Sequence, residues 1–434
     1  MRQFTSLQVA ILALGSLCFS SAYAGSTLVP MSDAELSATR GQALMSMSYI
    51  APTDAASNSN TNGNMGFYRL ALDAQLELNA NIKKLQLGCG GVNGAGACDI
   101  DIDYLSLSGG TVDSTSAERA ASSAVITNPF LEFAVKNPNS ASTREIQGFR
   151  LSAKSLSGLL TFGLQNGDAA SGINSLSGYL ITKPTGGTVT TNPYYGITQD
   201  ETNTAITGRA TVLGQGVTVP FTSTAYNLNL GVGTGTLSMG EQIITGKRIN
   251  TANLKATATV GGLAISGTLN ATASVLGIPI PISGNVTGSV DNLDVNVAIK
   301  QSLGYFHAAQ LNGSGYLSVQ GVNILWPEAA STAQTGWWLE LTNPIDIGQI
   351  TPTGSVDIAL STIVDALGQV SAYLNSPGHA VECGILAANC LIVGNLPVGT
   401  VDLTGKTPAS MTLTNVVLQK QNFSANCYGS LKFC

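Results

Sequence analysis

The most regular pattern in the sequence is an alternation of apolar and polar positions over residues 68–82. Tyr68, Leu70 and Leu72 open the apolar set, which continues at every second position to Ile82. Because successive side chains of a strand point to opposite faces, this period predicts one long strand with a dry face and a wet face. At about 3.3 Å per residue it would reach on the order of 50 Å. We therefore expect an extended or curved antiparallel sheet around one core.

The same alternation predicts further strands elsewhere in the chain. Residues 45–49 alternate methionine or tyrosine with serine, and residues 293–300 alternate Leu, Val and Ile with mostly polar residues. Pro279 and Pro281 interrupt an isoleucine-rich stretch, and proline cannot donate a ladder hydrogen bond, so this stretch is expected at a sheet edge or crossing. The predicted fold class is all-β: an extended, curved antiparallel sheet or sandwich with long amphipathic strands.

Two helices are expected beside the strands. Ser32 and Glu35 have the spacing of a capping box and Gly41 can end a helix, which predicts a short helix over residues 33–40. A second helix is predicted near residues 360–375, where Leu360, Ile363 and later apolar residues recur at steps of three and four. The expected organisation is a signal peptide (1–24), a segment with a short helix, a strand and a polar linker from about residue 53 (25–64), a main β body (65–355) and a helix-containing, cysteine-rich C-terminal segment (356–434).

The first 24 residues have the pattern of an export signal. A cationic start at Arg2 precedes a short apolar stretch, and small residues stand two apart at Ala22 and Ala24. We expect cleavage after Ala24, and the apolar stretch is too short to span a bilayer. Cys18 raises the alternative of a lipoprotein signal, although Leu17, which is not small, precedes it.

Six of the seven cysteines form three close pairs outside this leader. The pairs are Cys89 with Cys98, Cys383 with Cys390, and Cys427 with Cys434. Each is predicted to form a disulfide, because short loops close most easily and exported proteins keep such bonds. Other connectivities are open from spacing alone, since six cysteines allow about 15. Metal binding is the alternative, but thiolate sites usually have a spacing of two to four residues with histidines in support.

Composition narrows the classes of partner. Only 10% of the 434 residues are charged and the net charge is −6, while hydrophobic residues make up 44%. The chain is expected to fold, to expose polar surfaces of Ser, Thr, Asn and Gly, and to associate with itself. A chain with this net charge and no basic run gives no reason to expect nucleic acid as a partner.

No catalytic motif appears in the sequence. A nucleophile elbow needs Gly-x-Ser-x-Gly, and that pentapeptide is absent. The only histidines, His307 and His379, follow an aromatic stretch and a Pro-Gly turn, where structural roles are the simpler interpretation. We therefore predict a protein that is not an enzyme and has no cofactor, while a secreted enzyme of another type stays an alternative.

A calcium hypothesis rests on Asp99, Asp101 and Asp103. On a strand these alternate positions place three carboxylates on one face, with about 7 Å between each residue and the next on that face. Calcium needs several oxygens converging at about 2.4 Å, so loop carbonyls would have to complete the site. The alternative is a solvated acidic face that protects a sheet edge.

Three local features resemble Fil-type pilus assembly and filament proteins of Gram-negative bacteria. They are residues 31–43, residues 99–109 with the alternating aspartates, and residues 128–133 together with 144–151. The resemblance covers about the first third of the chain. It implies a β-rich protein with a surface or filament role, whose partners are other copies of itself or filament and pilus components, and it assigns no active-site residue.

The expected function is that of an exported structural or adhesive protein at the cell surface or in a filament, otherwise in the periplasm. A periplasmic or outer-membrane protein that binds lipid or hydrocarbon is one alternative, because the apolar face over residues 68–82 could line a cavity. An outer-membrane β-barrel is another, although aromatic residues are only 6%. Trp337, Trp338, Tyr194, Tyr195 and Ile278 are either contact patches or ordinary core.

Overall fold

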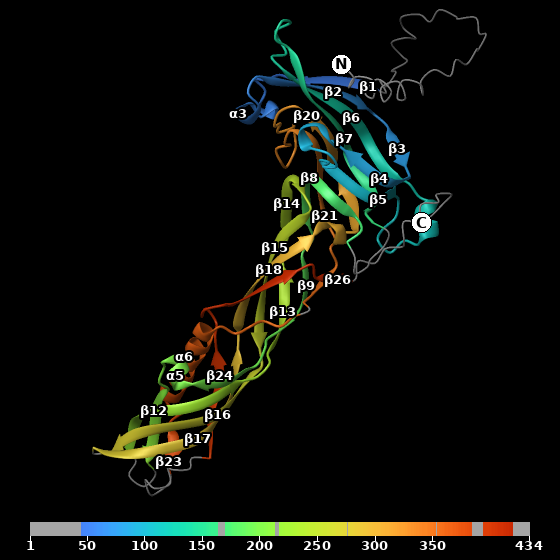
Figure 1. Ribbon diagram of the computed structural model, residues 1–434. Helices are drawn as coiled ribbons and strands as arrows, with labels where there is room; N and C mark the ends of the chain where they lie inside the picture. Colours follow the sequence, from blue (N-terminus) through green and yellow to red (C-terminus); the bar gives the residue numbers. More distant parts are fainter. Residues whose placement is uncertain are drawn as a thin grey trace, which may run out of the picture. The chain divides into compact units, whose positions relative to one another are not determined.

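The computed structural model describes residues 45–163, 170–212, 217–275, 277–352, 354–383 and 394–419. Strands make up 61% and helices 11% of the structure, which confirms the all-β prediction. The described residues belong to one compact unit, and they form three sheets (Figure 1).

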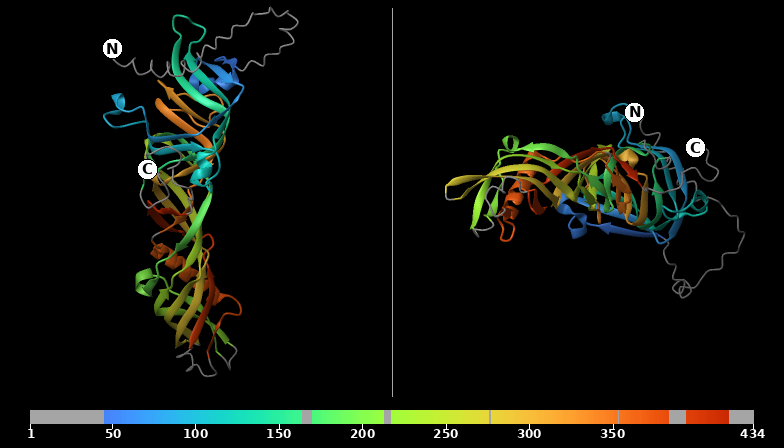
Figure 2. Two further views of the ribbon diagram at one scale, coloured as in Figure 1. Left: turned by 90° about the vertical axis from the view of Figure 1, so that its right-hand side faces the viewer. Right: turned by 90° about the horizontal axis from the view of Figure 1, so that it is seen from below.

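The largest sheet has twelve strands. Its main path runs β1-β2-β6-β7-β20-β21-β8-β5-β4, with β3, β14 and β19 attached to β6, β8 and β7. Views that differ by 90° both show that this sheet is curved (Figures 1 and 2). The strands are β1 (Met45–Ile50), β2 (Met65–Leu72), β3 (Gln75–Leu78), β4 (Ala80–Leu87), β5 (Ile100–Ser108), β6 (Ala124–Lys136), β7 (Glu145–Thr161), β8 (Ile173–Thr182), β14 (Gln242–Ile249), β19 (Ala308–Gly313), β20 (Gly315–Gln320) and β21 (Gly336–Ile345).

Two sheets of seven strands complete the β structure. One has the order β23-β11-β12-β16-β17-β24 with β10 attached to β12, and the other has the order β25-β18-β15-β13-β9-β22-β26. The first contains β10 (Tyr194–Thr198), β11 (Thr207–Val212), β12 (Val217–Leu230), β16 (Leu263–Val275), β17 (Ile278–Asp291), β23 (Val381–Cys383) and β24 (Asn395–Asp402). The second contains β9 (Thr185–Thr190), β13 (Thr234–Met239), β15 (Thr251–Gly261), β18 (Leu293–Ser302), β22 (Gln349–Thr351), β25 (Ala409–Thr414) and β26 (Val417–Gln419).

The helices of the described residues are short except for one. They are α3 (Ser59–Asn62), α4 (Ser116–Ala120), α5 (Gln199–Thr202) and α6 (Leu360–Asn375), with 3-10 turns η2 (Ala55–Ser57), η3 (Gly91–Asn93) and η4 (Leu303–Tyr305). Helix α6 confirms the predicted helix near residues 360–375, and Ile363, Leu367 and Val370 form its buried side. The helix expected over residues 33–40 lies outside the described residues.

The two seven-stranded sheets share one hydrophobic core. In β18 every second residue is buried, as the alternation over residues 293–300 predicts, and β15 has the same burial pattern. Leu254 of β15, Leu269 of β16, Val295 of β18 and Leu367 of α6 belong to the same cluster of buried side chains, which also includes Leu176 of β8. The core therefore continues from these sheets into the twelve-stranded sheet.

Several pairings differ from the expected antiparallel sheet. Strands β11 and β23, β17 and β24, β18 and β25, β21 and β8, and β22 and β9 pair in parallel. The sheets are therefore mixed. Strand β17 pairs with β16 from Ile278 onward but meets β24 only from Asn285, so Pro279 and Pro281 have a single neighbouring strand among the described residues. Among the described residues these prolines therefore lie at an edge, as the sequence predicts.

The long strand predicted over residues 68–82 is wrong in its continuity. From Ala71 to Gln75 the chain advances four residues while its partner strand advances three, from Phe130 to Thr127, so a bulge separates β2 from β3. Strand β4 then leaves this partner and pairs with β5. The face expected to be dry is also partly solvated, since Leu76 is 44% exposed.

Residues 53–64 are a folded turn rather than a polar linker. They contain η2 and α3, and the Ser57 side chain is buried and donates to the carbonyl oxygen of Pro52 at 2.9 Å. Asn62 donates through Nδ2 to the Leu325 carbonyl oxygen at 2.8 Å and accepts from the Leu325 amide at 2.9 Å. Leu325 belongs to a loop over residues 323–335 that covers one face of the twelve-stranded sheet. The segment over residues 53–64 is therefore hydrogen-bonded to this loop.

Candidate functional site

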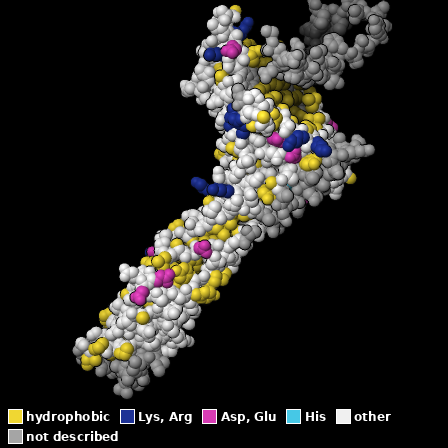
Figure 3. All heavy atoms as spheres, viewed as in Figure 1, with side chains coloured by type: hydrophobic (Ala, Val, Ile, Leu, Met, Phe, Trp, Pro, Cys, Tyr) yellow, Lys and Arg dark blue, Asp and Glu magenta, His cyan; other side chains and the backbone are white. Residues whose placement is uncertain are grey.

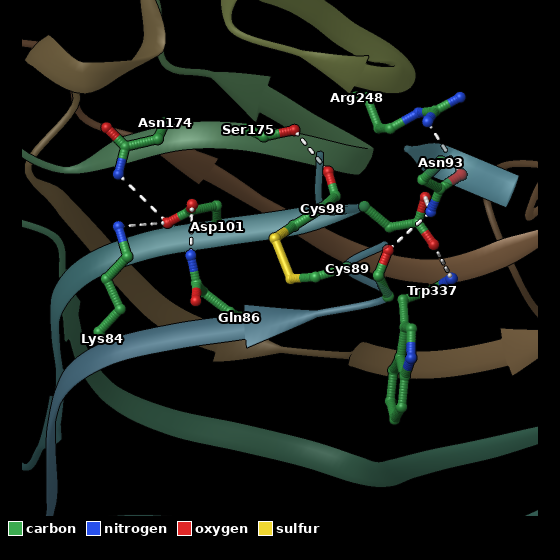
Figure 4. The surroundings of a disulfide bond; sticks show 12 residues. Lys84, Gln86, Cys89, Asn93, Cys98, Asp101, Asn174, Ser175, Arg248 and Trp337 are labelled. Carbon is green, nitrogen blue, oxygen red and sulfur yellow. Dashed lines mark hydrogen bonds and ion pairs between the residues drawn. A yellow bond between two sulfur atoms is a disulfide. The ribbon is translucent and has the colours of Figure 1, made fainter. Parts of the chain in front are cut away.

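The disulfide between Cys89 and Cys98 joins the end of β4 to the start of β5 (Figure 4). The loop that it closes contains η3, and Asn93 of this turn donates to the Gly88 carbonyl oxygen at 2.6 Å. Arg248 of β14 donates to Asn93 Oδ1 at 2.8 Å, so a neighbouring strand supports the loop. One of the three predicted cysteine pairs is thus confirmed.

The other predicted pairs are not described to the level of their side chains. Cys383 ends the short strand β23, but its side chain lies outside the described atoms. Cys390, Cys427 and Cys434 lie outside the described residues. Their pairing stays a prediction from sequence.

The three alternating aspartates do not converge on one point. Asp101 and Asp103 share the ammonium group of Lys84, at 2.8 Å and 3.0 Å, and Asn174 donates to Asp103 at 2.7 Å. Partial burial of Asp101 acts to raise its pKa, but hydrogen bonds from Lys84, Gln86 and Asn174 outweigh burial and lower it overall. One lysine therefore bridges both carboxylates and offsets one of their two charges, and Figure 4 shows Lys84 beside Asp101.

Asp99 has a different role. Its side chain is buried and accepts from the Trp337 amide at 3.0 Å and from Asn93 Nδ2 at 3.3 Å, so it joins the disulfide loop to β21. Among the described residues, no group of three or more His, Cys, Asp or Glu side chains is placed to hold a metal ion. Strand β5 lies between β8 and β4, so the expectation that these aspartates protect a sheet edge is wrong.

The twelve-stranded sheet carries two parallel rows of apolar side chains, called here the apolar rows. Consecutive members are direct cross-strand partners and therefore share one face of β1, β2, β6, β7, β20 and β21. The first row is Tyr49, Tyr68, Phe133, Phe149, Val319 and Trp337, and the second is Met47, Leu70, Leu131, Leu151, Leu317 and Leu339. None of these twelve described side chains is fully buried.

Exposure in the apolar rows is uneven and is highest at Met47 of β1, while Leu317, Trp337 and Leu339 at the other end pack against the main core. Met47 is 82% exposed, Leu151 47% and Tyr49 41%. Hydrophobic side chains gather over β1, β2 and β6 in the upper part of the space-filling view (Figure 3). The Tyr49 and Tyr68 rings stack with their centroids 4.5 Å apart, so the aromatic row is ordered as well as exposed. Large contiguous apolar patches on a protein surface mark contact sites.

The opposite face of the same strands carries a buried ionic row. Glu132 of β6 is fully buried and accepts from Arg69 Nε of β2 at 3.0 Å and from Arg150 Nη2 of β7. Arg150 also donates through Nη1 to the Pro327 carbonyl oxygen at 2.9 Å. Burial lowers the pKa of Arg150, and the neighbouring Glu132 opposes that shift.

A loop over residues 323–335 covers this ionic face. Glu340 of β21 is buried and accepts from the amides of Ala330 at 2.8 Å and Ser331 at 3.0 Å, and from the Tyr316 hydroxyl at 3.2 Å. Burial and the Glu340 charge raise the pKa of Tyr316, which therefore donates throughout the physiological range. The loop packs a second core of Met65, Phe67, Ala134, Tyr179, Tyr316, Ile324, Trp326, Ala333 and Trp338 against the sheet.

A cavity of about 420 Å³ opens beside the ionic row. It is lined by Arg69, Ala71, Asn128, Phe130, Arg150, Ser152, Ala153, Lys154, Ser314, Gly315, Tyr316, Glu328 and Glu340. The Arg69 guanidinium lies over the Phe130 ring, 4.1 Å from its centroid, which fixes its orientation at the cavity wall.

Both histidines make contacts that belong to the fold. His307 is 1% exposed, and its Nδ1 lies 2.9 Å from the Phe162 carbonyl oxygen. His379 follows α6, with Nδ1 2.9 Å from Ser376 Oγ and its ring against Tyr373. Ser376 Oγ also lies 2.6 Å from the Tyr373 carbonyl oxygen, so this pair belongs to the end of the helix.

The sequence candidates for contact patches divide between core and surface. Trp338 is 1% exposed and belongs to the second core, whereas its neighbour Trp337 is a member of the first apolar row. Tyr195 is 72% exposed and Ile278 66%. None of the helices in the described ranges is long and apolar enough to cross a membrane.

Sequence reasoning missed the ionic row and its cavity. Arg69, Glu132 and Arg150 are far apart in sequence, and each stands alone between two large apolar residues. In a chain with so few charges, such isolated charges within apolar strands are a signal for buried pairing. The chain matches no protein-family model, no curated protein and no solved structure.

Proposed function

We propose that this is an exported structural or adhesive protein without enzymatic activity, which assembles with other copies of itself at the cell surface or in a filament. The observation that carries the proposal is strand β1, an exposed and uncharged end strand continuous with the apolar rows. The leader-like N-terminus and the Cys89–Cys98 disulfide support an oxidising destination outside the cytoplasm.

Strand β1 has the properties of a site for strand addition. Within the described chain it pairs with β2 alone, and residues 45–49 are exposed on both faces. Its sequence, MSMSYI, contains no charge and no proline, the usual protections of an edge strand. A second chain can add to such an edge by main-chain hydrogen bonds and cover the apolar side chains on the same face.

The other end of this sheet is protected. Strand β4 pairs only with β5 among the described strands, but it carries Lys83 and Lys84, and both are exposed. Lysines on an edge strand disfavour pairing with another chain. Association through the ends of this sheet is therefore expected at β1 and disfavoured at β4.

A filament or pilus role extends the self-association and agrees with the resemblance of the first third of the chain to Fil-type proteins. Fractionating and then shearing cells tests it, because a surface filament protein should appear in the sheared fraction. If all of the protein stays soluble in the periplasm as a monomer, the proposal fails.

A substitution in β1 tests the contact itself. Burying the Met47 side chain contributes about 1.5–3 kcal/mol, so Met47→Lys should weaken association by roughly ten- to a hundred-fold. Sedimentation velocity of the purified protein over a range of concentrations measures this. Ile278→Lys is the matched control, because Ile278 is also an exposed apolar strand residue. A monomeric wild-type protein, or an equal loss in both variants, contradicts the proposed contact.

Binding of lipid or hydrocarbon is a second candidate, favoured by the same apolar rows. Leu70, Leu131 and Leu151 are successive cross-strand partners on β2, β6 and β7 and offer a continuous aliphatic surface. Organic extraction of the purified protein followed by mass spectrometry measures any bound lipid. About one lipid per chain supports this candidate, and its absence together with concentration-dependent assembly supports the first.

A further inference from the structure

The cavity beside the ionic row has the features of a binding site for an acidic ligand. We propose that it binds a small organic carboxylate that also carries hydroxyl groups, of the size and kind of a sugar acid. The residues that carry the inference are Arg69, Arg150, Lys154 and Glu328 in the cavity wall, with Glu132 behind them. The site does not depend on self-association, because β1 contributes none of its lining residues.

The cavity wall has spare cationic donors. The acids at its base are already occupied, since Glu132 is bound by two arginines and Glu340 by the covering loop. Arg69 Nη2 and Arg150 Nε are buried atoms with no hydrogen-bond partner in the part of the chain that the structure describes. Arg150 itself is only 2% exposed, so solvent does not replace the missing partner. Buried donors without acceptors are rare and costly. An acidic ligand that displaces Glu328 would supply the acceptor that Arg69 Nη2 lacks.

Glu328 stands where the ligand's carboxylate would bind. Its Oε2 lies 3.5 Å from Arg69 Nη2, which is an ion-pair distance without a hydrogen bond. The Glu328 side chain is 76% exposed. Its φ of +63° is a left-handed conformation that glutamate seldom adopts. A ligand carboxylate can displace this loosely held side chain and form the shorter hydrogen bonds that arginine offers.

The rim of the cavity favours hydroxyl groups over a hydrocarbon tail. Asn128, Ser152 and Ser314 line it, together with Lys154, which is exposed at its edge. Ser152 Oγ donates to the Gly315 carbonyl oxygen at 3.0 Å and so keeps its lone pairs available as acceptors. The volume of about 420 Å³ lies within the range of small-molecule sites. One hexose-sized acid is therefore a fitting occupant.

Isothermal titration of the purified protein tests the site with three probes. We expect saturable binding of D-glucuronate and none of D-glucose, which has the ring without the carboxylate. Hexanoate, a carboxylate without hydroxyls, should bind more weakly than glucuronate. Binding of glucose as tight as that of glucuronate would overturn the acidic site, and equal binding of hexanoate would overturn the role of the hydroxyl rim.

Variants separate this proposal from adventitious binding. Glu328→Gln removes the competing carboxylate from an exposed loop and should tighten glucuronate binding about two- to five-fold. Glu77→Gln, at an exposed glutamate of β3, is the matched control and should leave binding unchanged. Arg69→Gln should abolish binding, and Lys154→Gln, which leaves Glu132 paired, should weaken it. Absence of glucuronate binding in both wild type and Glu328→Gln would refute the site.

Self-association and ligand binding can fail separately. Met47→Lys should bind glucuronate like the wild type even where its assembly is lost. A loss of both properties in that variant would contradict the separation of the two surfaces on opposite faces of the sheet.

Discussion

Glu132 of β6 forms ion pairs with Arg69 of β2 and Arg150 of β7. The substitution Glu132→Gln tests how much these ion pairs contribute to the free energy of unfolding. The substitution keeps the shape of the side chain but removes its charge, and the new amide group faces one of the two guanidinium groups. Arg69 is partly exposed and can turn to water and Glu328, whereas the Arg150 side chain is 3% exposed and cannot. The main consequence is thus one buried, uncompensated cation.

The expected loss follows from that cation. Removing one partner of a buried ion pair costs about 3–5 kcal/mol, and most of this should come from Arg150. The total free energy of unfolding of a native protein is about 5–15 kcal/mol. The substitution should therefore remove a large share of the stability of the twelve-stranded sheet. Glu145→Gln, at an exposed glutamate of β7, should change stability by less than about 0.5 kcal/mol.

Urea unfolding followed by tryptophan fluorescence measures the change, because Trp326 and Trp338 belong to the core beside the ion pairs. A loss below about 1 kcal/mol would refute the buried-cation argument. The double variant Glu132→Gln with Arg150→Met should be more stable than Glu132→Gln alone, because it also removes the unpaired charge. If the double variant instead shows the sum of the two single losses, the cation is not the source of the cost.

Three further outcomes are expected. Replacing Cys89 and Cys98 by serine should lower the free energy of unfolding by about 2.5–3 kcal/mol, and non-reducing mass mapping should find these two bonded to each other and not to the C-terminal cysteines. Gly187→Ala should cost about 3 kcal/mol or more, measured by chemical unfolding, because the added Cβ would lie 1.8 Å from a carbonyl oxygen of β22. Asp101→Asn should lower stability at pH 7, where the carboxylate binds Lys84. Because the folded pKa of Asp101 is lowered, that difference should persist above about pH 4 and vanish as the pH falls through the lowered pKa.

The sequence predicted the type of structure but not how the strands pair. Alternation over residues 293–300 identified β18, and recurrence at steps of three and four identified α6, because each element has one buried side. Over residues 68–82 the same alternation spans a bulge and a change of partner strand. Period two describes side-chain direction within a strand and carries no information on where a neighbouring strand begins or ends.

The ionic row could not be predicted from the sequence for a related reason. Asp99, Asp101 and Asp103 looked like a group because they are close in sequence, but Asp99 faces Trp337 while the other two face Lys84. Arg69, Glu132 and Arg150 meet only because β2, β6 and β7 are neighbours. Long-range pairing decides which charges meet, and it depends on the whole sheet.

The opposite faces of β6 restrict where the chain can accept an insertion. Leu131 and Phe133 belong to the apolar rows, while Glu132 between them belongs to the ionic row. One residue added to this strand would move the side chains that follow it to the opposite face of the sheet. Glu132 would then face away from its arginines, or the apolar side chains would face the ionic row. An epitope tag is better placed in the turn at residues 139–143, between β6 and β7, where it would report the protein on intact cells without disturbing either face.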